Sequence, residues 1–213
     1  MLKPFDSFYF TDSPNIFTVS GFVSVIKYLY PYFWRMIKRV IFCGLFCILF
    51  FPAQSQVYKT LKAKLSFVSD APLEVIKASN HQVAGILDVS SQQFSFKANM
   101  KNFEGFNSPL QKEHFFENYM ETDQYPESTF TGKIIEPLTL KGRQVVRAKG
   151  MLTVHGIANE VLIEVNLEWT PKGVNFLSEF VILLDDYNIH VPRIVSQKIA
   201  KEIKLKCKGN LQG

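Results

Sequence analysis

The chain has 213 residues with a formal net charge of +5, and 47% of its residues are hydrophobic. This length suits one barrel or two small domains. Five basic and two acidic residues before residue 56 carry +3 of the charge, which leaves +2 on residues 56–213. A net charge this close to zero gives no support to the basic patch that nucleic-acid-binding proteins need. We therefore expect no nucleic-acid partner.

Residues 36–55 have the pattern of a secretory signal peptide. Lys38 and Arg39 form a basic start, residues 40–51 are an apolar run, and Ala53 and Ser55 form a small-x-small site. We therefore expect cleavage before Gln56 and a periplasmic or secreted mature protein. The apolar run is shorter than the roughly 20 residues of a membrane-spanning helix, so no stable membrane span is expected in the mature chain.

Residues 1–35 precede this segment, although a signal peptide normally begins at the initiator methionine. We interpret Met36 as the true start and residues 1–35 as an over-extended N-terminus. The alternative is a genuine extension in which residues 16–34 and 40–51 are buried together in a membrane. Lys27, Pro31 and the basic residues at 35–39 interrupt that pattern. Residues 56–213 remain as the folded domain.

From Val57 onward, apolar residues recur at every second position, which is typical of strands with one buried face. The first strand is predicted to bury Val57, Leu61, Ala63, Leu65 and Phe67. The alternation returns at residues 83–89, 94–100, 130–134, 146–154, 161–169, 174–182 and 199–207. Residues 155–159 are short enough to join two strands as a hairpin, and residues 170–173 place Pro and Gly at a second turn.

Residues 108–123 break this alternation. Ser108 suits a helix N-cap, Pro109 the first helical position and Gln111 the third position after the cap, so a short helix is predicted. Another helical turn is predicted within residues 74–80. Amphipathic strands with one apolar face avoid exposed edges when the sheet closes. The sequence therefore predicts an all-β, antiparallel, roughly eight-stranded barrel with one or two short helices.

Two motifs of the predicted domain are specific when they are taken together. Residues 113–117 read Glu-His-Phe-Phe-Glu and are followed by Gln-Tyr-Pro-Glu-Ser-Thr-Phe at 124–130, while residues 150–156 read Gly-Met-Leu-Thr-Val-His-Gly. They resemble a helix with a double Phe, a Tyr-Pro that opens a Thr-Phe strand, and a Gly-x-Leu-Thr-x-His-Gly hairpin of the YceI-like family. The resemblance covers roughly residues 56–208. It implies an exported lipocalin-like barrel whose apolar lumen takes a polyisoprenoid chain.

The candidate ligand-binding residues are the apolar ones that the alternation directs into the lumen. The interior of an eight-stranded barrel either is filled by its own side chains or holds one small ligand. For an isoprenoid or other lipid, we predict contacts with Leu65, Phe67, Phe94, Phe96, Phe130, Ile163, Leu167, Phe176 and Phe180.

Catalysis and metal binding have less support in the sequence. His81, His114 and His190 lack metal-ligand spacing, and Cys207 has no His or Cys neighbour. His155 is interpreted as a turn residue that ties the hairpin through side-chain hydrogen bonds. We therefore expect a lipid carrier without a cofactor or metal rather than an enzyme. Two points stay open: the oligomeric state, and the alternative of a side-chain-filled barrel that acts as an interaction or stress-related module without a ligand.

Overall fold

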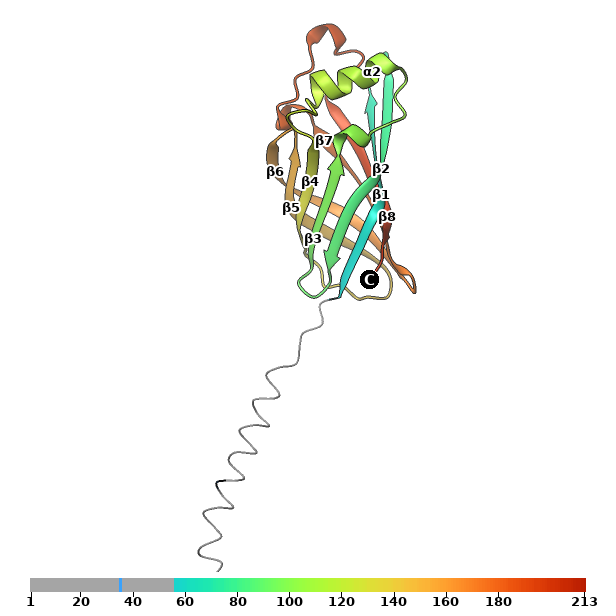
Figure 1. Cartoon of the computed structure of the whole chain (residues 1–213), viewed down its shortest axis with the longest axis vertical. Helices are drawn as coiled ribbons and strands as arrows, with labels where there is room; N and C mark the ends of the chain where they lie inside the picture. The colour runs from blue at the N-terminus through green and yellow to red at the C-terminus, as the bar shows by residue number, and fades with distance from the viewer. Residues whose placement is uncertain (1–34, 36–55) are drawn as a thin grey trace, which may run out of the picture. The chain divides into compact units, whose positions relative to one another are not determined.

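The structure is a computed structural model that describes residue 35 and residues 56–213. The signal peptide predicted at 36–55 and, apart from Arg35, the over-extended N-terminus predicted at 1–35 lie outside the described residues. From residue 56, the chain forms a closed barrel of eight antiparallel strands that follow one another around the barrel in sequence order (Figure 1). The predicted all-β barrel is thereby confirmed.

The strands are β1 (Val57–Asp70), β2 (Val75–Asp88), β3 (Gln93–Asn99), β4 (Glu127–Ile134), β5 (Gly142–Val154), β6 (Ile157–Thr170), β7 (Gly173–Leu183) and β8 (Glu202–Leu211). The helical segments are α2 (Pro109–His114), the π-helical turn η2 (Phe115–Tyr119) and the 3-10 turns η1 (Met100–Asn102), η3 (Asp185–Tyr187) and η4 (Arg193–Val195). All eight strands and both hydrophobic clusters lie within residues 56–213, so this segment has a core of its own.

The alternation of apolar residues positions the core as predicted. On β5, the side chains of Val146, Ala148 and Leu152 point inward and are almost fully buried. The hairpin after β5 is tighter than predicted, because Val154 already pairs with Ile157. Its turn consists of His155 and Gly156, with φ angles of 49° and 74°. Positive φ at both central residues matches the twist of the flanking strands, so residues 157–159 extend β6.

The first strand departs from the predicted pattern. The strand pairing shifts between Thr60 and Ala63, where β1 contains one residue more than β2. Such a bulge changes the face on which the following residues lie. Leu61 is therefore 75% exposed, and Tyr58 instead of Val57 packs against the core. The predicted burial of Leu61 is wrong, and Val57 is half-buried outside the core clusters. Ala63 and Phe67 are buried as predicted, and Leu65 is half-buried and packs against the core.

The helix prediction is confirmed at residue 108 and wrong at residues 74–80. The Ser108 hydroxyl accepts a hydrogen bond from the backbone N–H of Gln111 at 3.1 Å, which caps α2. Residues 75–80 belong instead to β2, where pairing with β1 buries Ala78 and Asn80 on alternate positions. Pairing along a whole strand stabilises the extended form more than local helix propensity opposes it.

The two ends of the barrel differ. Figure 1 shows α2 lying across one end, with the C-terminus at the other. At the C-terminal end, the rings of Tyr58 and Trp169 meet edge to face at 5.5 Å, and Val174 and Leu211 are buried beside them. These side chains fill that end.

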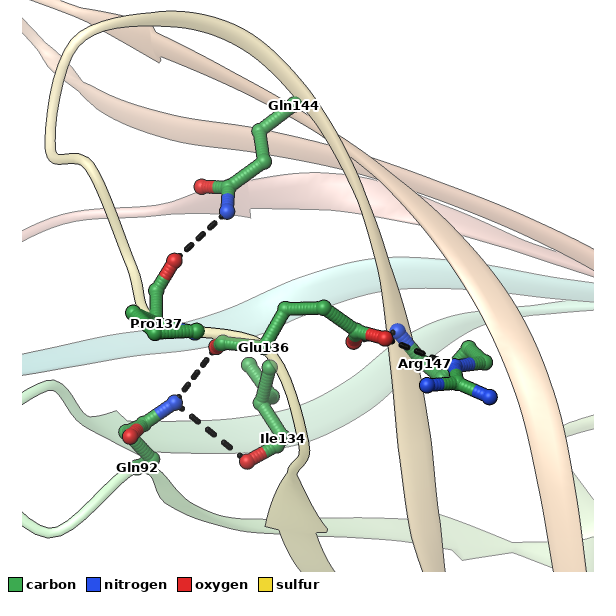
Figure 2. A network of polar contacts seen from close by, with 6 residues as sticks. All are labelled: Gln92, Ile134, Glu136, Pro137, Gln144 and Arg147. Atoms are coloured by element: carbon green, nitrogen blue, oxygen red, sulfur yellow. Dashed lines mark hydrogen bonds and ion pairs between the residues drawn. The ribbon is translucent and has the colours of Figure 1, made fainter.

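A polar network fastens the loops of the same end (Figure 2). The side-chain amide of Gln92 donates to the carbonyl oxygens of Ile134 and Glu136, at 3.3 and 2.6 Å. The Glu136 carboxylate in turn accepts from the backbone N–H and the guanidinium of Arg147, both at 2.6 Å. The connection from β4 to β5 is thus held to the turn before β3 on one side and to β5 on the other.

Candidate functional site

The barrel encloses a cavity of about 550 Å³ whose wall is formed by side chains from all eight strands. This volume lies within the range of small-molecule sites, which are mostly apolar with few polar groups. The barrel is therefore not filled by its own side chains.

Every residue of the predicted ligand-binding set lies on the cavity wall: Leu65, Phe67, Phe94, Phe96, Phe130, Ile163, Leu167, Phe176 and Phe180. Some of them, such as Leu167 and Phe176, are buried among neighbours. Others, such as Leu65 and Phe180, point inward but are only half-buried, because they face the hollow. The rings of Phe96 and Phe176 lie 5.1 Å apart, and those of Phe94 and Phe130 lie 4.7 Å apart.

The sequence interpretation missed lining residues of two kinds. The first kind shares the alternation and was available from it, as with Leu152 on β5 and Leu205 on β8. The second kind comes from the segment around α2, where no period gave a signal. There the ring of Phe115 stacks on Phe67 at 5.3 Å and lies 5.0 Å from Phe106. The first residue of the double Phe, Phe115, therefore contributes to the cavity wall.

Two buried hydroxyl groups of the cavity lining, those of Ser69 and Ser178, are already hydrogen-bonded to the protein. The Ser178 hydroxyl donates to the Glu164 carbonyl at 2.7 Å, and the Ser69 hydroxyl accepts from the backbone N–H of Ala200 at 2.9 Å. Burial raises the pKa of the Cys207 thiol to about 12, so this thiol is neutral at physiological pH. Within residue 35 and residues 56–213, no group of three His, Cys, Asp or Glu side chains is placed to hold a metal ion.

The cavity opens at the α2 end, where exposed residues form part of its lining. Leu110, His114 and Lys198 are exposed there. The side-chain amide of Gln111 donates to the Glu74 carboxylate at 3.0 Å, which links α2 to the turn between β1 and β2. The depth of the site is therefore mostly apolar, and polar side chains lie beside the exposed Leu110 at its mouth.

His155 lies outside the lining of this cavity and has the structural role that the sequence indicated. Its ring nitrogen Nδ1 lies 3.2 Å from the Tyr187 carbonyl oxygen, and Nε2 lies 2.7 Å from a Glu121 carboxylate oxygen. The ring also packs on Tyr125 at 4.6 Å. The hairpin turn is thereby fixed to the loop after η2 and to η3.

The family model described as YceI-like domain matches residues 52–211. BcnA of Burkholderia cenocepacia has a similar structure, with a TM-score of 0.60 and 16% sequence identity over 71% of this chain and 96% of that chain. A polyisoprenoid binding domain from Saccharophagus degradans, implicated in plant cell wall breakdown, gives a TM-score of 0.64 and 11% identity over 75% of this chain and 99% of that one.

The YceI protein of Campylobacter jejuni gives a TM-score of 0.53 and 14% identity over 64% of this chain and 84% of that chain. At these identities the likeness concerns the fold. A search of curated proteins finds no match. In the described part of the chain, no helix is long and apolar enough to cross a membrane.

Proposed function

Because the chain belongs to the YceI-like family, we propose that it is an exported lipid-binding protein that holds a polyisoprenoid or similar long apolar chain in its barrel. The observation that carries this proposal is the apolar cavity of about 550 Å³ inside the barrel. The Saccharophagus degradans structure, described as a polyisoprenoid binding domain, supports the same class of ligand through its shared fold.

Apolar burial supplies the affinity in this proposal. Each buried methylene contributes about 0.8 kcal/mol, so roughly ten buried carbons contribute about 8 kcal/mol. This offsets a large part of the freedom lost on association, about 4 to 15 kcal/mol. Longer chains therefore bind more tightly, and the polar groups at the mouth need only orient the end of the ligand.

The alternatives have less support from the cavity. A barrel that acts without a ligand needs no hollow lumen, because side chains can fill the interior of eight strands. Catalysis needs an activated nucleophile beside a base, whereas the Cys207 thiol on the cavity wall has a raised pKa. We therefore propose binding and not catalysis, with no cofactor.

Export rests on the sequence of residues 36–55. The proposal is that the signal peptide is removed and that the mature protein, residues 56–213, acts in the periplasm or outside the cell. N-terminal sequencing of the protein from its native host checks this, with Gln56 as the expected first residue. A mature chain that begins before residue 36 contradicts both the cleavage and the interpretation of residues 1–35.

Solvent extraction of the purified native protein, followed by mass spectrometry, tests the proposed ligand class. We expect one long-chain isoprenoid or fatty lipid in near-stoichiometric amount. Phe180→Glu places an unpaired charge in the apolar lumen, which is costly for a bound chain, and most of the lipid should be lost. The matched control is Val181→Glu, because Val181 is 53% exposed on the outer face of the same strand.

A second variant separates lipid loss from misfolding. Leu205 is half-buried and faces the cavity, so Leu205→Trp reduces the free volume without adding charge. We expect a folded barrel with markedly less bound lipid. If both inward variants fold and retain as much lipid as the parent, the lumen is not the binding site.

A further inference from the structure

Three exposed apolar side chains lie near the open end of the cavity: Leu110 is part of its lining, and Leu73 and Ile194 are the chain neighbours of the lining residues Glu74 and Val195. Leu73 follows β1 and is 66% exposed, Leu110 on α2 is 59% exposed, and Ile194 in η4 is 92% exposed. The backbone N–H of Leu73 donates to the Gln197 carbonyl at 2.9 Å, so the turn after β1 lies against the connection between β7 and β8. In Figure 1 this connection and α2 lie at the same end of the barrel.

The connection between β7 and β8 begins with Asp185 and Asp186 in η3, and the part that follows them is basic. From residue 187 to residue 201 it contains Arg193, Lys198 and Lys201 and no acidic residue. Lys201 lies 3.5 Å from the Asp185 carboxylate. Within residues 56–213, no ion pair engages Arg193 or Lys198. Two unpaired cations therefore flank the most exposed isoleucine of the barrel.

We propose that this rim docks on the surface of an anionic lipid bilayer. The rim is defined as Leu73, Leu110, Arg193, Ile194 and Lys198. Its apolar side chains enter the interface between headgroups and acyl chains, while its two cations contact the anionic headgroups. The inference rests on the proposed function, because docking in this orientation places the open end of the cavity against the source of its ligand. A lipid chain then passes between bilayer and lumen without exposing its apolar length to water.

The charges favour a bilayer over a second copy of the chain. A symmetric dimer through the rim brings Arg193 and Lys198 of both copies together, and like charges across an interface are unfavourable. Glu74, Glu113 and Glu117 lie at the same end, so the basic surface there is confined to the part of the connection that carries Ile194. Anionic headgroups complement that connection directly.

Vesicle co-sedimentation of residues 56–213 tests the proposal. We expect binding to vesicles of phosphatidylcholine mixed with phosphatidylglycerol, and much weaker binding to phosphatidylcholine alone. Ile194→Glu removes the apolar tip and adds a repelling charge, so the affinity should fall about tenfold or more. Arg193→Gln and Lys198→Gln should each weaken binding about fivefold.

The matched control is Leu61→Glu, because Leu61 is 75% exposed on β1 away from the mouth and should leave vesicle binding unchanged. Equal binding of the Ile194→Glu variant and the parent overturns the proposal, as does absence of parent binding to anionic vesicles. A parent that instead elutes as a dimer, with a monomeric Ile194→Glu variant, assigns the rim to a second copy and also overturns it.

Lipid content is measured on the same samples. Loss of docking with lipid retained leaves the carrier function standing, and docking by a protein without lipid contradicts only the carrier function.

Discussion

The carboxylate of Glu121 lies 2.7 Å from Nε2 of His155 and joins the loop after η2 to the turn between β5 and β6. The same imidazole reaches the Tyr187 carbonyl oxygen through Nδ1 at 3.2 Å. His155 is also one of the residues with positive φ, at 49°. A single buried side chain thus holds three segments at the α2 end of the barrel.

Replacing His155 separates its hydrogen bonds from its backbone conformation. His155→Ala loses two hydrogen bonds, about 1 kcal/mol each, and retains the left-handed strain of about 1 kcal/mol. His155→Gly loses the same bonds but accepts the positive φ. We expect the alanine variant to be about 1 kcal/mol less stable than the glycine variant in urea denaturation. Two variants as stable as the parent would show that the contact contributes nothing.

Gly156 tests the packing under this turn. A Cβ at Gly156 would lie 2.5 Å from the Tyr125 ring, whereas a Cβ at Gly105 meets no atom within 4 Å. Both glycines have positive φ, at 74° and 90°, so alanine is strained at either position. We expect Gly105→Ala to cost about 1 kcal/mol and Gly156→Ala clearly more, measured by thermal unfolding. Equal losses would mean that the Tyr125 ring moves freely away.

Cys207 predicts a loss of stability at alkaline pH. Desolvation raises the pKa of its thiol from 9.0 to about 12. As the pH rises, the thiol ionises in the unfolded chain before it ionises in the native protein, which favours unfolding. The contribution of the neutral Cys207 thiol to the free energy of unfolding is therefore complete below about pH 9 and is lost as the pH rises toward 12. Cys207→Val should flatten the decline of the unfolding free energy in this window. A parent and variant with parallel pH profiles would contradict the raised pKa.

Glu136 gives a prediction at acid pH. The backbone N–H of Arg147, and then its guanidinium, hold the pKa of the Glu136 carboxyl below its usual value. A carboxyl group whose pKa is lower in the native state than in the unfolded state stabilises the native state at pH values above its ordinary pKa. The stabilisation by Glu136 is lost as the pH falls through the pKa that this group has in the native protein. NMR titration should show the lowered midpoint in the parent and a smaller shift in Arg147→Met, which keeps only the backbone hydrogen bond. An unchanged midpoint in that variant would assign the whole effect to the backbone.

The period of the sequence explains why most of the fold was predictable. The alternation of apolar and polar residues along a strand indicates that residues such as Val146 and Leu167 point inward. A sheet whose strands each have one apolar face avoids exposed edges by closing into a barrel. The bulge between Thr60 and Ala63 was not predictable, because an extra residue leaves no mark on composition. The strand at 75–80 was also missed, since its burial depends on pairing with β1.

The candidate site was predictable in its wall but not in its volume. Alternation shows that Phe94 and Phe176 face inward, yet it does not reveal whether opposing side chains meet across the barrel. That outcome depends on the barrel radius and on residues without periodicity, such as Phe106 and Phe115. The open mouth lies between the turn after β1, α2 and the connection from β7 to β8. These three segments are distant in sequence, so no local sequence pattern predicts the mouth.

The most direct test of the central claim is a crystal structure of the protein purified with whatever it binds. The account predicts one continuous, elongated density that runs from the mouth near Leu110 into the depth beside Phe130 and Phe176. A chain fitted to that density should match the mass of the extracted lipid. A cavity that holds only water, or one closed by inward rotation of Phe176 and its neighbours, would contradict the claim that this barrel carries a lipid.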